Sequence, residues 1–104
     1  MTRFLYCFGY ETPQQWVLNR QHGWDDEDSA AVIIHAESAD AAYAWGREIA
    51  EASVRRLFER AAVADIPSWK AANFADAVED AVGDIDAPVV TVGEMPPTDW
   101  LQQS

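Results

Sequence analysis

The sequence predicts an α+β domain, or a small α/β domain, with a sheet of three or four strands on which one long helix and one or two short helices pack. Three observations lead to this prediction. The stretch from Ser38 to Ala62 repeats apolar residues at the period of an α-helix. The stretches 3–10, 30–37 and 88–94 have the apolar patterns of strands. No repeat or flexible linker divides the chain, so residues 1–104 are expected to form a single globular domain.

The first predicted strand, Arg3 to Tyr10, is apolar on both faces. Alternation places its residues in two sets, the aromatic Phe4, Tyr6, Phe8 and Tyr10 and the smaller Leu5, Cys7 and Gly9. Apolar residues on both faces are typical of a central, well-covered strand. We expect the long helix to pack on the small-residue face. The aromatic face then needs another cover, or it is exposed as a binding platform or as an interface between copies of the chain.

A helix-start signal follows the first strand. Thr12 can cap a helix, Pro13 suits the first helical position, and Gln15 can bond back to the cap. We predict a short helix over Gln14 to Gln21 that ends near Gly23. The contiguous tryptophan, valine and leucine within it leave an extended segment, paired with the first strand, as the alternative.

An exposed acidic loop is expected from Gly23 to Ser29. It contains Trp24 followed by the acidic residues Asp25, Asp26, Glu27 and Asp28. The run lacks the alternating ligands and central glycine of an EF-hand loop, so a solvated charge run is expected rather than a calcium site. An exposed aromatic residue beside a charged rim is common in protein-binding hot spots. We therefore predict that these five residues, with Trp45 of the long helix, contact a partner.

The second predicted strand covers Ala30 to Glu37 and runs directly into a helix cap at Ser38. Its two faces carry Val32, Ile34 and Ala36, and Ala31, Ile33, His35 and Glu37. A strand histidine most often makes one hydrogen bond, but histidine also titrates near neutral pH and binds metals. A ligand, metal or catalytic site near His35 therefore remains an alternative.

Small residues line the apolar stripe of the long helix. They are Ala42, Gly46, Ala50 and Ser53. A glycine inside a helix costs about 1 kcal/mol relative to alanine, so we expect a sheet to pack closely against Gly46. Trp45 points about 120° away from the stripe and is expected to touch a second element or lie on the surface.

The remainder of the chain alternates breaks with short elements. A break at Val63 to Ala72 contains a helix restart, and a second amphipathic helix is predicted over Phe74 to Ala81. Pro88 to Glu94 is the last predicted strand. The tail, Met95 to Ser104, is expected to be irregular, either folding back with Trp100 as an anchor or fraying.

The composition disfavours several functions. A net charge of −11 makes phosphate backbones and anionic lipids poor partners, so we expect no nucleic acid and no membrane. Cys7 is the single cysteine, which excludes an internal disulfide, and we expect a buried, inert thiol. No histidine or cysteine pair has a zinc-motif spacing, and no glycine-rich phosphate loop is present. We predict no catalytic residue, metal or cofactor.

These observations favour a small acidic protein-binding or regulatory domain without catalytic activity, whose protein partner is basic if it is charged. The N-terminal stretch lacks the long apolar core and cleavage site of a secretory signal, so a cytoplasmic location is expected. We expect a monomer or a small homo-oligomer. The alternatives are a small enzyme or a ligand- or metal-binding domain with its site near His35, and a homo-oligomeric structural protein.

Overall fold

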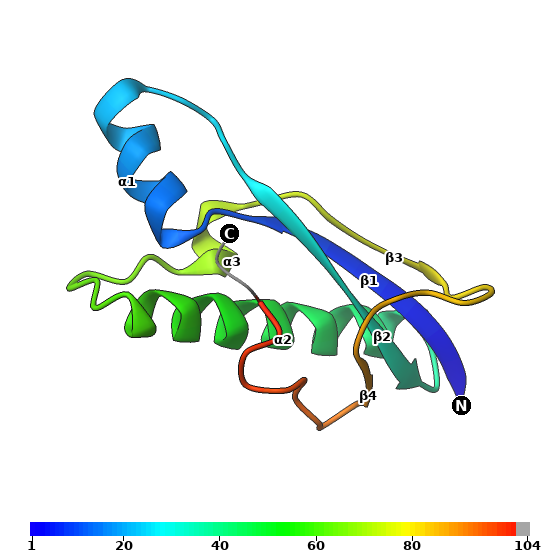
Figure 1. The fold of residues 1–104 in the computed structure, drawn as a ribbon. Coiled ribbons are helices and arrows are strands. Elements are labelled where there is room, and N and C mark those ends of the chain that lie inside the picture. Colours follow the sequence, from blue (N-terminus) through cyan, green and yellow to red (C-terminus); the bar gives the residue numbers. More distant parts are fainter. Residues whose placement is uncertain (102–104) are drawn as a thin grey trace.

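A computed structural model describes residues 1–101 of the chain. Its elements are β1 (Thr2–Tyr10), α1 (Pro13–His22), β2 (Asp28–Ala36), α2 (Ala39–Arg60), α3 (Trp69–Ala72), β3 (Asp76–Asp80) and β4 (Val89–Thr91). The four strands form one sheet in the order β3-β1-β2-β4, and α2 lies across one of its faces (Figure 1). The predicted α+β class is therefore confirmed.

Strand β1 is central, as predicted. It pairs antiparallel with β2 over its whole length and with β3 from Phe4 to Phe8. Strand β4 pairs with β2 in parallel, but only over Ile33 to His35. Strand β2 begins two residues before the predicted Ala30, so Asp28 belongs to a strand rather than to the acidic loop.

The long helix packs on the aromatic face of β1, so our expectation that it covers the small-residue face is wrong. The β1 aromatic side chains are all buried, and a Cβ atom added to Gly46 would lie 2.5 Å from Cγ of Tyr6. The small residues of α2 thus accommodate the large residues of β1, whereas two small-residue surfaces would leave voids between them. Because α2 covers the aromatic face, that face is not available as a binding platform or as an interface between copies.

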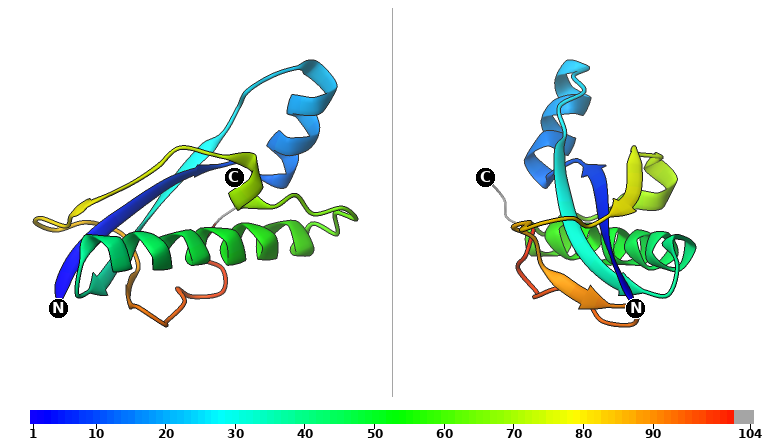
Figure 2. Two further views of the ribbon diagram at one scale, coloured as in Figure 1. Left: turned by 180° about the vertical axis from the view of Figure 1, so that it is seen from behind. Right: turned by 90° about the vertical axis from the view of Figure 1, so that its right-hand side faces the viewer.

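The opposite face of the sheet is crossed by the connection from β3 to β4. These two strands lie at opposite edges of the sheet, and Figures 1 and 2 show the connection passing over the side away from α2. Ile33 is fully buried but does not belong to the core between α2 and the sheet. The sheet therefore buries apolar residues on both faces, and the larger set of them lies under α2.

Local signals set the bounds of α1. The Thr12 Oγ1 atom accepts from the Gln15 N–H at 3.1 Å, and the Gln15 Oε1 atom accepts from the Thr12 N–H at 2.9 Å. Gly23, with φ of 68°, ends the helix in the left-handed conformation. The predicted helix is confirmed, and the extended alternative is excluded.

The helix predicted over Phe74 to Ala81 is wrong, because its centre forms strand β3. Burial alternates along it, with Asp76 and Val78 half-buried and Ala77 and Glu79 exposed. Its few apolar residues fit both a helical and a strand period, and pairing with β1 decides between them. The predicted helix restart is present just before it as α3.

The described part of the tail folds back along α2. Residues 95–101 lie outside helices and strands, Leu101 is buried, and the Trp100 Nε1–H donates to Ser53 Oγ at 2.8 Å. Of the two courses expected for the tail, these residues take the one anchored by Trp100. Gln102 to Ser104 lie outside the described residues.

Candidate functional site

The acidic loop, now defined as Gly23 to Glu27, directly follows α1. Helix α1 and this loop project beyond the sheet and α2 (Figure 1). The loop turns back toward β2 immediately after the helix cap. The Trp24 N–H donates to the carbonyl oxygen of Asn19 at 3.1 Å, which extends the α1 hydrogen bonding into the loop. The loop therefore starts from a fixed geometry.

The buried side chain of Asn19 holds the loop in shape. Its exposed fraction is 7%. Its Nδ2 donates to Glu11 Oε2 at 2.5 Å and to the Asp26 carbonyl at 2.8 Å, and its Oδ1 accepts from the Asp26 N–H at 3.1 Å. Asn19 was not predicted from the sequence, because its role depends on loop residues that lie seven positions away and no short motif marks it.

Trp24 is exposed in the loop, as the partner-binding prediction requires. Half of its surface, 50%, is accessible. Its ring stacks on the imidazole of His22, with 4.3 Å between ring centroids and an angle of 21° between planes. One ring face is thereby supported by the protein. The stacking limits the conformational entropy that Trp24 would lose on binding a partner.

The acidic residues around Trp24 have no basic partner within residues 1–101. Asp25, Asp26 and Glu27 are exposed, and none of the ion pairs in that part of the chain includes them. Asp28 is half-buried at the start of β2, where its Oδ1 accepts from Gln15 Nε2 at 3.2 Å. Trp24 and three exposed carboxylates thus belong to the same loop, and Asp28 lies at its base, at the start of β2.

Trp45 lies apart from this group. It is half-buried on α2, and its Nε1–H donates to the carbonyl oxygen of Glu94 at 2.8 Å. Helix α2 starts beyond the far end of β2, and nine strand residues span roughly 26 Å. Trp45 therefore contacts a second element, as expected for its position, and the structure does not place it in one patch with Trp24.

A second group of charged and polar side chains lies partly buried between α2 and the sheet edge. The carboxylate of Asp76, 10% exposed, accepts from the Tyr6 hydroxyl at 2.6 Å, from the Tyr43 hydroxyl at 3.1 Å and from Arg47 Nη1 at 3.1 Å. Burial, and then the hydrogen bond to Asp76, raises the pKa of the Tyr6 hydroxyl above its ordinary value. These four residues form the Asp76 cluster, which fastens β3 to β1 and α2.

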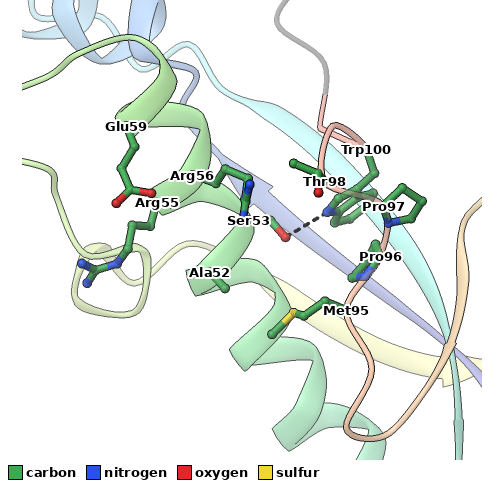
Figure 3. Close-up of a pocket in the computed structure, with 10 residues that line it drawn as sticks. All are labelled: Ala52, Ser53, Arg55, Arg56, Glu59, Met95, Pro96, Pro97, Thr98 and Trp100. Carbon is green, nitrogen blue, oxygen red and sulfur yellow. Dashed lines mark hydrogen bonds between the residues drawn. The ribbon is translucent and has the colours of Figure 1, made fainter.

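A groove lies between the second half of α2 and residues 95–100 (Figure 3). Its volume is about 220 Å³, below the roughly 300 Å³ at which ligand pockets usually begin. Figure 3 shows the Trp100 indole directed at Ser53 across it. Arg55 faces Glu51 at 3.8 Å, and Arg56 makes no ion pair within the described residues. The groove therefore offers one unpaired cation and little enclosure for a small molecule.

Trp16 borders a smaller cavity between α1, α2 and α3. The guanidinium of Arg20 lies 4.2 Å from the Trp16 ring centroid, and Phe58 packs edge-on at 5.9 Å. The Trp16 Nε1–H is buried without a hydrogen-bond partner in the described part of the chain. The cavity beside it holds about 40 Å³, which is too small for a ligand or cofactor.

Among residues 1–101, no metal site is found near His35. His35 is half-buried on β2, between Arg3 of β1 and Thr91 of β4 in the sheet register. Within residues 1–101, no group of three His, Cys, Asp or Glu side chains could hold a metal ion. Cys7 is half-buried, and burial, followed by the charge of Glu79, raises the pKa of its thiol.

Comparisons with known proteins give no indication of the function. No family model, no curated protein and no solved structure matches the chain. In the part that the structure describes, no helix is long and apolar enough to cross a membrane.

Proposed function

We propose that this chain is a non-catalytic protein-binding or regulatory domain that recognises a basic surface of its partner through the acidic loop and Trp24. The observation that carries the proposal is the half-exposed Trp24, stacked on His22 in a loop with three exposed carboxylates that have no basic partner in the described chain. Buried Asn19 holds this arrangement before any partner arrives.

The two components of the site contribute differently. Covering the exposed half of Trp24 removes roughly 100 Å² from water, worth about 2.5 kcal/mol. Rim charges contribute less, because an exposed ion pair adds at most about 1 kcal/mol. Their main effect is to attract and orient a cationic partner, since the whole molecule carries a charge of −11. Trp24 therefore supplies affinity, and the carboxylates supply selectivity for basic partners.

Two further observations favour binding over catalysis. The Asp76 carboxylate already accepts three hydrogen bonds, so it is a poor general base. The raised pKa of Cys7 disfavours the thiolate that a nucleophile requires. The single cysteine also suits a reducing compartment, so we place the protein's action in the cytoplasm.

The test is selection of peptide ligands from a random display library on the immobilised protein, with counter-selection on Trp24→Ala. We expect lysine- and arginine-rich peptides whose affinity falls about tenfold or more in Trp24→Ala. We expect a comparable loss when salt rises from about 50 to about 300 mM. The thermal midpoint of Trp24→Ala should stay within about 2 °C of wild type, because the side chain supports no core contact.

Two matched controls test whether binding depends on the acidic loop itself or on any exposed apolar or acidic residue. Val17→Ala shortens another exposed apolar residue, on α1, and should leave affinity unchanged. Amide substitutions at Asp25, Asp26 and Glu27 should weaken binding. The same change of charge at three exposed acids elsewhere on the surface, Glu37, Glu59 and Asp65, should have a smaller effect. Selection of neutral or acidic peptides, or equal effects of both triple variants, would refute the proposal.

A further inference from the structure

The two strands beside β2 pair with different lengths of it. Strand β1 pairs with all nine residues of β2, from Asp28 to Ala36. Strand β4 pairs with it only from Ile33 to His35. The first half of β2 therefore has an outer edge without a strand partner in residues 1–101, although β2 lies inside the sheet at its other end.

The main-chain groups of Ser29 and Ala31 are directed at this free edge. The Ile33 N–H donates to the Pro88 carbonyl at 2.8 Å, so the main-chain groups of Ile33 face β4. The pairing of β2 with β1 is uninterrupted, and main-chain groups alternate sides along a strand. Ser29 and Ala31 therefore face the same side as Ile33, and their N–H and C=O groups have no hydrogen-bond partner among the described residues.

A groove of about 370 Å³ follows this edge. Around the strand it is lined by Tyr10, Asp86, Pro88, Trp100 and Leu101. Pro88 immediately precedes β4, so the groove begins where the pairing with β4 stops. An extended chain placed in it would lie about 4.8 Å from β2, the usual distance between paired strands.

Tyr10 also brings to the groove a hydroxyl group that is unpaired within residues 1–101. Tyr10 is 4% exposed, and its hydroxyl makes no hydrogen bond within residues 1–101. Burial, and then the charge of Asp28, raises the pKa of this hydroxyl, so it stays protonated at neutral pH. It is therefore available to a ligand in the groove as a hydrogen-bond donor.

We infer that the basic partner of the proposed function binds as an added β-strand along the free edge of β2 at Ser29 to Ala31. The occupant is an extended, lysine- or arginine-containing segment of another protein, bound through its main chain. Charge complementarity favours this occupant, because Asp86 lines the groove and Asp28 begins the strand. The inference rests on the proposed function, since the edge leads directly from the groove to the acidic loop and Trp24.

The other outer edge of the sheet, on β3, is the weaker candidate and serves as a control. Residues Ala77 and Glu79 face β1, so the main-chain groups of Val78 face outward. Strand β3 is short and carries acidic residues, which are common means of keeping an edge from pairing. Its Asp76 is also occupied by the Asp76 cluster.

The first experiment compares two proline variants, each of which removes one outward-facing main-chain N–H from one edge of the sheet. Proline is accepted in a strand where its missing N–H would face away from the existing ladder. The probe is a labelled peptide of alternating lysine and valine, about eight residues long. We expect Ala31→Pro to weaken its binding about tenfold or more, and Val78→Pro to leave it unchanged. Circular dichroism and thermal unfolding check that both variants fold.

The second experiment uses the unmodified protein, so it does not depend on how a variant folds. Two versions of the peptide carry N-methyl groups on alternate residues, one on the lysines and one on the valines. An added strand directs alternate N–H groups at β2, so one version should lose binding and the other should keep it. Equal binding of both versions would overturn the inference.

The outcomes separate this inference from the proposed function. If Ala31→Pro binds the peptide normally while Trp24→Ala does not, the loop binds the partner and strand addition is wrong. If Val78→Pro alone loses binding, the added strand is on β3 and the inference is wrong. A dimer in native mass spectrometry that Ala31→Pro abolishes would make a second copy of the chain the occupant. Failure of the peptide to bind wild-type protein would overturn both proposals.

Discussion

The Asp76 cluster and the acidic loop use carboxylates in opposite ways. In the cluster, one partly buried carboxylate accepts three hydrogen bonds from β1 and α2. In the loop, three exposed carboxylates have no basic partner within residues 1–101. The difference teaches that the number of acidic residues does not indicate a binding site. The informative quantity is how many of them the fold has left without partners, and what lies beside them.

The largest expected effect comes from breaking the cluster. Asp76→Ala leaves the buried Tyr6 hydroxyl without its acceptor and the partly exposed Arg47 guanidinium without its ion pair. We expect a loss of about 3 kcal/mol in the free energy of unfolding, measured by urea denaturation. Asp80→Ala on the same strand removes an exposed carboxylate and should change stability by less than about 0.5 kcal/mol. A similar small change for Asp76→Ala would show that the cluster does not stabilise the fold.

A smaller effect is expected where the loop meets the fold. Asn19→Ala removes three hydrogen bonds and leaves the Asp26 main chain unpaired. We expect a loss of about 2 kcal/mol, together with faster amide hydrogen exchange in the acidic loop and unchanged exchange in β1. Uniformly faster exchange throughout the chain would mean that Asn19 supports the whole fold rather than the loop.

Raising the pH into the alkaline range should gradually lower the stability that Tyr6 of the Asp76 cluster contributes. Folding raises the pKa of Tyr6, chiefly by burial, so above pH of about 10 the unfolded chain releases a proton that the folded chain retains. The stabilisation is present below that pH and is lost as pH rises, by up to about 1.4 kcal/mol per pH unit. Urea denaturation of wild type and Tyr6→Phe from about pH 8 to 11 measures it. Parallel profiles would contradict this assignment.

How far the sequence predicts this structure depends on the sequence separation of the interacting residues. The capping box of Thr12 and Gln15 spans three positions and was predicted correctly, as were the α2 stripe and the central β1 strand. Strand β3 was missed because its pairing with β1 joins residues about seventy positions apart, and its short apolar pattern fits either period.

Sequence separation also explains which residues of the candidate site could be predicted. Composition predicted an exposed Trp24 among acids, because both signals lie within a few residues. Asn19 and the Asp76 cluster were missed, because their partners converge only in the folded chain; the Tyr6 and Asp76 positions are separated by 70 residues. Trp45 was grouped with the loop on chemical type alone, and its hydrogen bond to Glu94 and its place on the early part of α2, which follows the end of β2 away from the loop, could not be read from spacing.

The position of Trp24 has an optical consequence. Its indole is the most water-accessible of the tryptophans within residues 1–101, whereas that of Trp69 is buried and bonded to the Gly9 carbonyl. Collisional quenching of intrinsic fluorescence should therefore act mainly on Trp24. Because three exposed carboxylates follow Trp24 in the loop and the molecule carries a net charge of −11, caesium ions should quench its emission more effectively than iodide ions. Occupation of the loop by a ligand should suppress this difference, so the protein carries a built-in fluorescent reporter for the surface to which we assign its function.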